Sequence, residues 1–129
     1  MICLSLMSDI EHVLEGIKNS HIRIERLHLN AYIRVTQRLI DHVMTKTIDI
    51  GSVEVDREYR NCGYFTQFLI CIEIIAKKWD RKVYVECVHN KILHDMLRKR
   101  GYSVDDSGEN YFRGDLGRGN LGRGNLGSP

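Results

Sequence analysis

The chain has 129 residues, of which 43% are hydrophobic and 28% are charged, values typical of one soluble globular domain with its own core. A net charge of +2 is too small to indicate binding to nucleic acid or to a membrane surface. No stretch reaches the length of a membrane span. Cys3, Cys62, Cys71 and Cys87 form no CxxC pair, so we expect reduced thiols in a cytoplasmic protein, packed in the core with Cys62 as the exception.

The first segment of regular structure is expected to be a short amphipathic helix. The opening MICLSL lacks the basic residues of a signal peptide and fits either an edge strand or a leader ahead of a start at Met7. Ser8 and Glu11 form a capping-box pattern. Apolar residues follow at helical spacing, namely Ile10, Val13, Leu14 and Ile17. This pattern predicts a helix over 8–19.

Two segments of alternating polarity come next. In HIRIERLHL the phase of the alternation shifts between Ile24 and Leu27, which predicts one bent strand. The segment AYIRVTQRL alternates regularly and predicts a straight one.

The following strand carries a glycine at a change of phase. Ile48 and Ile50 share one parity, whereas Val53 and Val55 share the other, and Gly51 lies between them. A one-residue slip at a glycine is typical of a β-bulge. The alternative is a strand that is apolar on both faces, where parity carries no information. The glycine favours the bulge.

A long helix and a buried strand follow the segment at Gly63. A continuous apolar stripe predicts a helix over 64–79. Its members are Phe65, Phe68, Leu69, Ile72, Ile75, Ala76 and Trp79. The segment KVYVECV at 82–88 is typical of a central strand.

The last ordered elements are expected to be a helix and a hairpin. Asn90 is a good N-cap, and Gly101 is a good left-handed C-cap. Between them, the residues expected to face inward are Ile92, Leu93, Met96 and Leu97. SV, the turn DDSGEN and YFR then predict a β-hairpin.

The chain therefore divides into a domain at 1–113 and a tail at 114–129. The tail repeats LGRGN twice and has no apolar period, so we expect it to be flexible. The order helix, three strands, helix, strand, helix and hairpin predicts an α/β (α+β) fold with helices packed on a mixed sheet.

The loop between the third strand and the long helix is the best candidate for a binding site. Arg60, Asn61, Cys62, Gly63, Tyr64, Phe65 and Thr66 lie where a helix N-terminus offers backbone N–H groups to an anion. Gly63 allows close approach, Arg60 adds charge and Thr66 adds a hydroxyl. An ordinary strand-to-helix turn is the alternative.

Two motifs at the right separation resemble those of the GCN5-related N-acetyltransferase (GNAT) superfamily. Val55, Arg60, Gly63 and Phe65 match the spacing of its signature V-x-x-x-x-[RQ]-x-x-G-x-[GA]. The positions of its second signature are occupied by Asn90, Leu93, Leu97, Gly101 and Tyr102. The resemblance covers about half of the chain strictly. It implies an acyl-CoA N-acyltransferase fold with a bulged strand, in which strands 48–55 and 82–88 are parallel neighbours joined by the helix 64–79.

The resemblance also implies roles for individual residues. Backbone groups near Val53 and Val55 would bind the pantetheine arm of acetyl-CoA, the co-substrate. Residues Asn61 to Thr66 would hold its pyrophosphate, and Asn90 would contact the cofactor near the thioester.

Three departures from the family pattern are visible. Phe65 stands where the family prefers glycine or alanine, and we expect its ring to turn into the core. Leu97 replaces a tyrosine that often protonates the leaving thiolate. The N-terminal part has one helix where the family usually has two.

Two acidic residues are candidates for the base that deprotonates an amine acceptor. Asp49 and Glu86 lie near positions where relatives carry a catalytic glutamate, although each is also compatible with a structural or solvated role. His89 and His94 match no metal-ligand spacing, so no metal site is expected.

The sequence thus favours an acetyl-CoA-dependent N-acetyltransferase that moves an acetyl group directly to a small-molecule or protein amine. The alternative is a GNAT-like protein that binds coenzyme A or a protein partner without turnover. Arg118 and Arg123 of the tail give too little electrostatic affinity to indicate nucleic-acid binding. No membrane partner is expected, and the sequence leaves open a monomer or a homodimer.

Deletion of 115–129 should leave the melting temperature and the affinity for acetyl-CoA nearly unchanged, because this segment offers no apolar face to pack. Thermal melts and calorimetric titrations of the full and truncated chains test this. A clear loss of stability on truncation would show that the repeats dock on the domain.

Overall fold

A computed structural model describes residues 4–86, 88 and 90–113. The helices are α1 (Leu4–Glu15), α2 (Tyr64–Lys78) and α3 (Lys91–Lys99). The strands are β1 (Asn19–Ile24), β2 (Leu29–Ile40), β3 (Val43–Val55), β4 (Lys82–Val85), β5 (Ser103–Val104) and β6 (Tyr111–Arg113). The tail at 114–129, Cys3, Cys87 and His89 lie outside the described residues. Cys71 is buried and Cys62 is exposed, as expected.

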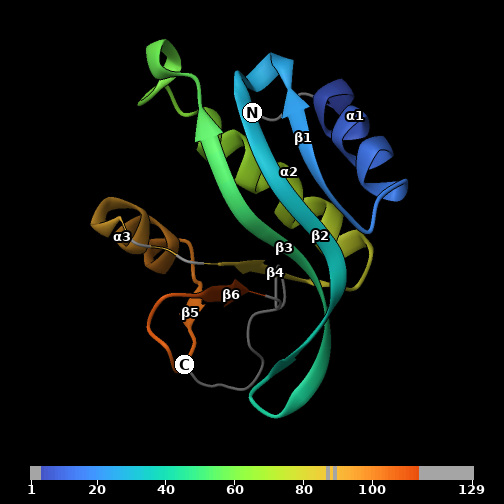
Figure 1. The fold of residues 1–129 in the computed structure, drawn as a ribbon, viewed down its shortest axis with the longest axis vertical. Coiled ribbons are helices and arrows are strands. Elements are labelled where there is room, and N and C mark those ends of the chain that lie inside the picture. The colour runs from blue at the N-terminus through green and yellow to red at the C-terminus, as the bar shows by residue number, and fades with distance from the viewer. Residues whose placement is uncertain (1–3, 87, 89, 114–129) are drawn as a thin grey trace.

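The six strands form one mixed sheet in the order β1-β2-β3-β4-β6-β5 (Figure 1). β3 and β4 are parallel neighbours, whereas the other neighbouring pairs are antiparallel. The helix α2 connects β3 to β4, and the antiparallel pair β5 and β6 forms the final hairpin. These findings confirm the predicted mixed sheet, its parallel central pair and the hairpin.

The bulge predicted in the third strand is present. Ile33 of β2 pairs with Ile50, and the preceding residue, Tyr32, pairs with Ser52. Gly51 is therefore an extra residue in β3, which changes the phase of the strand.

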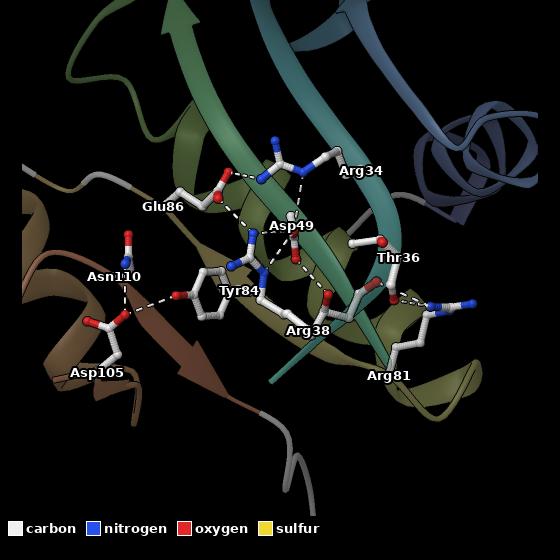
Figure 2. A network of polar contacts seen from close by, with 10 residues as sticks. Arg34, Thr36, Arg38, Asp49, Arg81, Tyr84, Glu86, Asp105 and Asn110 are labelled. Carbon is white, nitrogen blue, oxygen red and sulfur yellow. Dashed lines mark hydrogen bonds and ion pairs between the residues drawn. The ribbon is translucent and has the colours of Figure 1, made fainter. Parts of the chain in front are cut away.

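Helices α1 and α2 pack on one face of the sheet; in the view of Figure 1, α2 runs behind β2 and β3, and α1 lies beside β1. α1 contributes Leu6, Ile10 and Leu14 to the core, and α2 contributes most of its predicted apolar stripe. Among the described residues, no helix crosses the opposite face of β2, β3 and β4, which carries Arg34, Asp49 and Glu86 (Figures 1 and 2). We call this side the open face.

The first helix differs from its prediction. α1 begins at Leu4 and ends at Glu15, so Ser8 and Glu11 lie inside it and do not cap it. Glu11 instead accepts hydrogen bonds from Trp79 Nε1 at 3.0 Å and from Lys78 Nζ at 3.1 Å. Glu11 therefore connects the middle of α1 to the end of α2.

The prediction of one bent strand over HIRIERLHL was wrong. β1 ends at Ile24, a 3₁₀ turn spans Glu25–Leu27, and β2 begins at Leu29 after His28, which has φ +53°. The change of phase in the sequence marks a reversal of the chain that buries Leu27, rather than a kink within a strand.

Helix α3 begins as predicted and differs in one inward residue. The side chain of Asn90 accepts hydrogen bonds from the backbone N–H of Ile92 at 2.8 Å and of Leu93 at 3.3 Å. Gly101 follows the helix with φ +90°, as expected for a left-handed C-cap. Leu97 is fully buried, but Ile92 is 79% exposed because it lies in the first turn and faces away from the sheet core.

A buried carboxylate, which the sequence analysis did not single out, ties α2 to α3 and β6. Glu73 of α2 pairs with Arg100, accepts a hydrogen bond from Tyr102 Oη at 2.8 Å and lies 3.6 Å from Arg113 Nη1. Burial, together with the nearby charge of Glu73, raises the pKa of Tyr102. The two arginines are each about one quarter exposed, so water screens the cluster in part.

Replacement Glu73→Ala should lower the free energy of unfolding by about 2–4 kcal/mol, because it leaves two arginines and a buried hydroxyl without their shared acceptor. Asp95→Ala removes an exposed (i, i+4) ion pair with Lys91 and should cost less than about 0.5 kcal/mol. Urea denaturation measures both changes. Equal stabilities of the two variants would contradict a structural role for Glu73.

Candidate functional site

The parallel pair β3 and β4 separates after four residue pairs, which opens a cleft. The pairing ends at Ile50 with Val85, and the backbone N–H of Glu86 then donates to the carbonyl of Ile50 at 3.0 Å. Beyond this point, which we call the apex, lies a cleft of about 940 Å³. Such a volume is at the upper end for ligand pockets. The cleft is bounded by the end of β3, the start of α2 and the first turns of α3.

Most of the residues predicted to bind a cofactor line this cleft. They are Val53, Val55, Arg60, Asn61, Gly63, Tyr64, Phe65, Thr66 and Asn90. Cys62 is exposed and does not belong to the lining, and its thiol lies 3.6 Å from the carbonyl oxygen of Arg60. Phe65 is half-buried and packs against the core, as its position in the apolar stripe predicts.

The N-terminus of α2 has the geometry of an anion site. Gly63 is its N-cap at φ +84°, and no side chain caps the helix. Asn61 also has a positive φ of 64°, so the loop turns sharply at two positions. A Cβ added at Gly63 would meet nothing within 4 Å, which leaves the first amides of the helix open to a ligand.

Arg60 is turned back onto the strand rather than toward the helix. Its Nε donates to the carbonyl of Val55 at 3.0 Å, and its Nη2 lies 3.9 Å from Glu54. The side chain is 52% exposed. Arg60 therefore fastens the loop to β3 and keeps a positive charge at the edge of the cleft.

Residues near the β1–β2 turn contact the loop that precedes α2. Arg23 donates two hydrogen bonds to Asp56 at 2.9 and 2.8 Å, which lowers the pKa of that carboxyl group. The ring of His28 stacks on Tyr59 with centroids 3.6 Å apart, and Tyr64 packs edge-on against both. These contacts hold the segment between β3 and α2 in place through the protein's own side chains.

Asp49 lies on the open face in a network of four charged side chains (Figure 2). It is fully buried, and its Oδ1 accepts a hydrogen bond from Thr47 at 2.6 Å. Its Oδ2 accepts from Arg38 Nε at 3.0 Å and Nη2 at 2.9 Å, and from Arg34 Nε at 3.4 Å. Both oxygens of Asp49 are thus engaged by side chains of β2 and β3.

Glu86 belongs to the same network but lies nearer the apex. It pairs with Arg34 Nη2, and its Oε2 accepts from Arg38 Nη2 at 2.7 Å. Its side chain is 20% exposed, and a Cβ on Gly51 would lie 3.3 Å from its Oε1. The structure therefore brings the two acidic candidates together and places only Glu86 beside the bulge.

A second group of hydrogen bonds joins this network to the β5–β6 turn (Figure 2). The guanidinium of Arg38 lies 4.1 Å above the ring of Tyr84, whose hydroxyl donates to Asp105 at 3.0 Å. Burial and Asp105 raise the pKa of Tyr84 to about 12. Burial tends to raise the pKa of Asp105, but hydrogen bonds, including those from Ser107 and Asn110, lower it to about 2.

Two residues of α3 bear on the family comparison and on packing, and Leu97 faces inward as predicted. Leu97 is fully buried in the core and does not line the cleft, so a tyrosine at this position would overpack the core. The Nδ1 atom of His94 lies 2.7 Å from the hydroxyl of the buried Tyr111, so this side chain packs against β6.

Tyr32, Arg34 and Arg38 were not identified from the sequence. Their spacing of two or four residues along β2 places them on one face, opposite Ile33. This polar periodicity was the signal that the sequence offered. It does not show that Asp49 of β3 and Glu86, which follows β4, lie next to these side chains.

No metal site or membrane-spanning helix was found in the part of the chain that the structure describes. It contains no group of histidine, cysteine and acidic residues able to hold a metal ion. Its helices are also too short or too polar to cross a bilayer.

Comparison with solved structures identifies the fold. A GNAT-family acetyltransferase from Listeria monocytogenes superposes with a TM-score of 0.58 at 16% identity, covering 85% of this chain and 86% of that one. The chain has the GNAT fold. AtaT complexed with acetyl-methionyl-tRNAfMet matches with a TM-score of 0.57 at 11% identity, covering 68% of this chain and 62% of that one.

A third solved structure matches over part of its length, and the sequence comparisons found no match. The KacTA–DNA complex matches the GNAT fold of this chain with a TM-score of 0.52 at 12% identity, covering 67% of this chain and 57% of that one. The chain thus spans less than two thirds of the AtaT and KacTA chains. No protein-family model and no curated protein matches its sequence.

Replacement Gly51→Ala should destabilise the protein by about 1–3 kcal/mol through overpacking at the bulge. The added Cβ would come within 2.8 Å of the Tyr32 ring and 3.3 Å of the Glu86 carboxylate, so these side chains must move. Gly16→Ala has no contact closer than 3.8 Å and should be neutral or stabilise by up to about 1 kcal/mol. Thermal and urea unfolding measure both. Equal effects would show that the bulge does not require a glycine.

Proposed function

We propose that this protein is an acetyl-CoA-dependent N-acetyltransferase. The observation that carries the proposal is the cleft beyond the β3–β4 apex, which joins a bulged strand edge to the open N-terminus of α2. An anion-binding helix end at one side and a free strand edge at the other suit a long ligand with a diphosphate and an amide-containing arm. Acetyl-CoA has this construction, and the GNAT fold supports the assignment.

Different segments of the cleft would bind different parts of acetyl-CoA. Backbone amides of the segment from Asn61 to Thr66 would bind the pyrophosphate, and the edge of β3 at Val53 would bind the arm. Val55 has its carbonyl engaged by Arg60, so its contribution depends on that side chain turning away. Asn90 caps α3 in the wall of the cleft, where its amide nitrogen can donate to the ligand.

Of the two acidic candidates, we assign Glu86 a direct role in the reaction. Asp49 would hold the arginines that position Glu86. Glu86 lies beside the bulge and is partly exposed, whereas Asp49 is buried and engaged at both oxygens. A proton taken up by Asp49 would break its pairs with Arg34 and Arg38. Glu86 would orient the acceptor or a water molecule that removes its proton, and the thioester supplies the activated acetyl group.

Binding of coenzyme A without turnover is the second candidate. It is favoured by the burial of Leu97, which leaves α3 without a tyrosine in the cleft at the family position. General acid catalysis commonly contributes about 10²–10⁴-fold, so its loss would slow transfer without abolishing it.

The RNA and DNA partners of AtaT and KacTA are not extended to this protein. The described arginines of the open face are paired with Asp49 and Glu86, which leaves little net positive charge to attract phosphate chains. We propose an amine carried by a small molecule or a protein as the acceptor.

Replacement Gly63→Asp should weaken acetyl-CoA binding by about tenfold or more relative to Gly63→Asn. The two side chains are similar in size and both tolerate the positive φ of this position, so they differ mainly in the negative charge beside the diphosphate. Titration calorimetry with acetyl-CoA measures the affinities, and melting curves confirm folding.

The outcomes separate the candidate functions. If both variants bind acetyl-CoA as tightly as the unaltered protein, the loop is an ordinary turn and the proposal fails. If acetyl-CoA binds but no amine promotes thiol release, the protein binds the cofactor without turnover.

A further inference from the structure

The proposed position of acetyl-CoA leaves one route for the acceptor. The cleft is walled by the start of α2 and by Leu93 and Met96 of α3, all on the helical side of the sheet. A substrate filling it would close that side of the apex. The acceptor must then reach the thioester from the open face, where Glu86 and the bulge at Gly51 lie.

The open face next to the apex is built from a cation, an anion and a phenol. Arg34 lies over the Tyr32 ring, with its guanidinium carbon 5.5 Å from the ring centroid. The same guanidinium pairs with Glu86. The ring of His21 lies 4.7 Å from that of Tyr32.

Arg34 can give up its contact with Asp49 at small cost. Its bond to Asp49 is long at 3.4 Å, and Asp49 keeps Arg38 and Thr47 when Arg34 turns away. The side chain of Arg34 is 28% exposed, so a ligand can reach it from solvent. Arg38 lacks this freedom, since its removal would leave the buried Asp49 with a single weak cationic partner.

We infer that the acceptor is an amine that carries a carboxylate or a phosphate close to its nitrogen, with the anion bound by Arg34 and the nitrogen directed by Glu86. This inference rests on the proposed function. Arg34 gives an acceptor's anion a planar cationic partner, whereas an acceptor that brings only positive charge, such as a polyamine, has no use for it.

The transfer requires no reactant other than the amine and acetyl-CoA. The neutral amine forms a C–N bond with the acetyl carbonyl carbon, and the C–S bond of the thioester breaks. The nitrogen loses one proton and the departing sulfur gains one, through Glu86 or water.

The test compares pairs of amines that differ only in the anion. O-phosphoethanolamine is compared with ethanolamine, and L-alanine with L-alaninamide, each at equal concentration of free amine. Thiol release from acetyl-CoA should give a kcat/KM that is about tenfold or more higher for the anionic member, the effect of one charge-assisted hydrogen bond. The two pairs distinguish phosphate from carboxylate.

Substitutions at Arg34 test whether its side chain causes this preference. Arg34→Gln should reduce the ratio to about twofold or less, and Arg34→Lys should retain part of it because the charge remains. Arg26→Gln, which alters an exposed arginine paired with Asp9 outside the cleft, should leave the ratio unchanged. Acetyl-CoA affinity should remain the same in all three.

Two results would overturn the inference while the proposed function stands: equal rates within both pairs, or an unchanged preference in Arg34→Gln. If no amine is turned over, the same pairs are compared by ligand-observed NMR on the coenzyme A complex. The absence of excess binding by the anionic members overturns the inference there too. Failure of acetyl-CoA itself to bind refutes the proposed function instead.

Discussion

The site depends on where β3 and β4 stop pairing. Four residue pairs hold the parallel strands together, and β4 then ends at Val85 while β3 continues through the bulge at Gly51 to Val55. A parallel sheet that separates in this way exposes backbone groups that must find other partners. Arg60 already occupies one of them, at the carbonyl of Val55, and we propose that the arm of acetyl-CoA occupies others.

The charge network on the open face holds this separation in place. Arg34 and Arg38 reach from β2 across β3 to Glu86, the first residue after β4, and Asp49 lies beneath them (Figure 2). Buried and half-buried ion pairs contribute little net stability compared with apolar packing, but they specify geometry when every member is satisfied. Here they fix three strands relative to one another at the apex, while the helical side supplies the apolar core.

The sequence predicted the local features well, because each has a local physical cause. The glycine at the change of phase predicted the bulge, Asn90 predicted the start of α3, and the apolar stripe predicted α2. The bent strand at 21–29 was wrong, because a phase shift records a change of face but not whether the chain reverses.

The candidate site was predictable only in part. The loop from Arg60 to Thr66 was visible because a strand, a glycine and a helix are contiguous in the chain. The pairing of Arg34 with Glu86 joins residues 52 positions apart and depends on the sheet order. The inward position of Leu97 was predicted from the apolar spacing of α3, but the contact of His94 with Tyr111 joins α3 to β6 and was not.

Hydrogen exchange of the backbone amides, resolved by residue, tests most directly whether acetyl-CoA occupies this cleft. Addition of acetyl-CoA should slow exchange at 51–55 and 61–66, because the ligand binds the edge of β3 and the start of α2. The amides of β1 (Asn19–Ile24), at the far edge of the sheet, should be unaffected. Unchanged exchange at 51–55 and 61–66 in the presence of saturating acetyl-CoA, or protection confined to β1, would contradict this account.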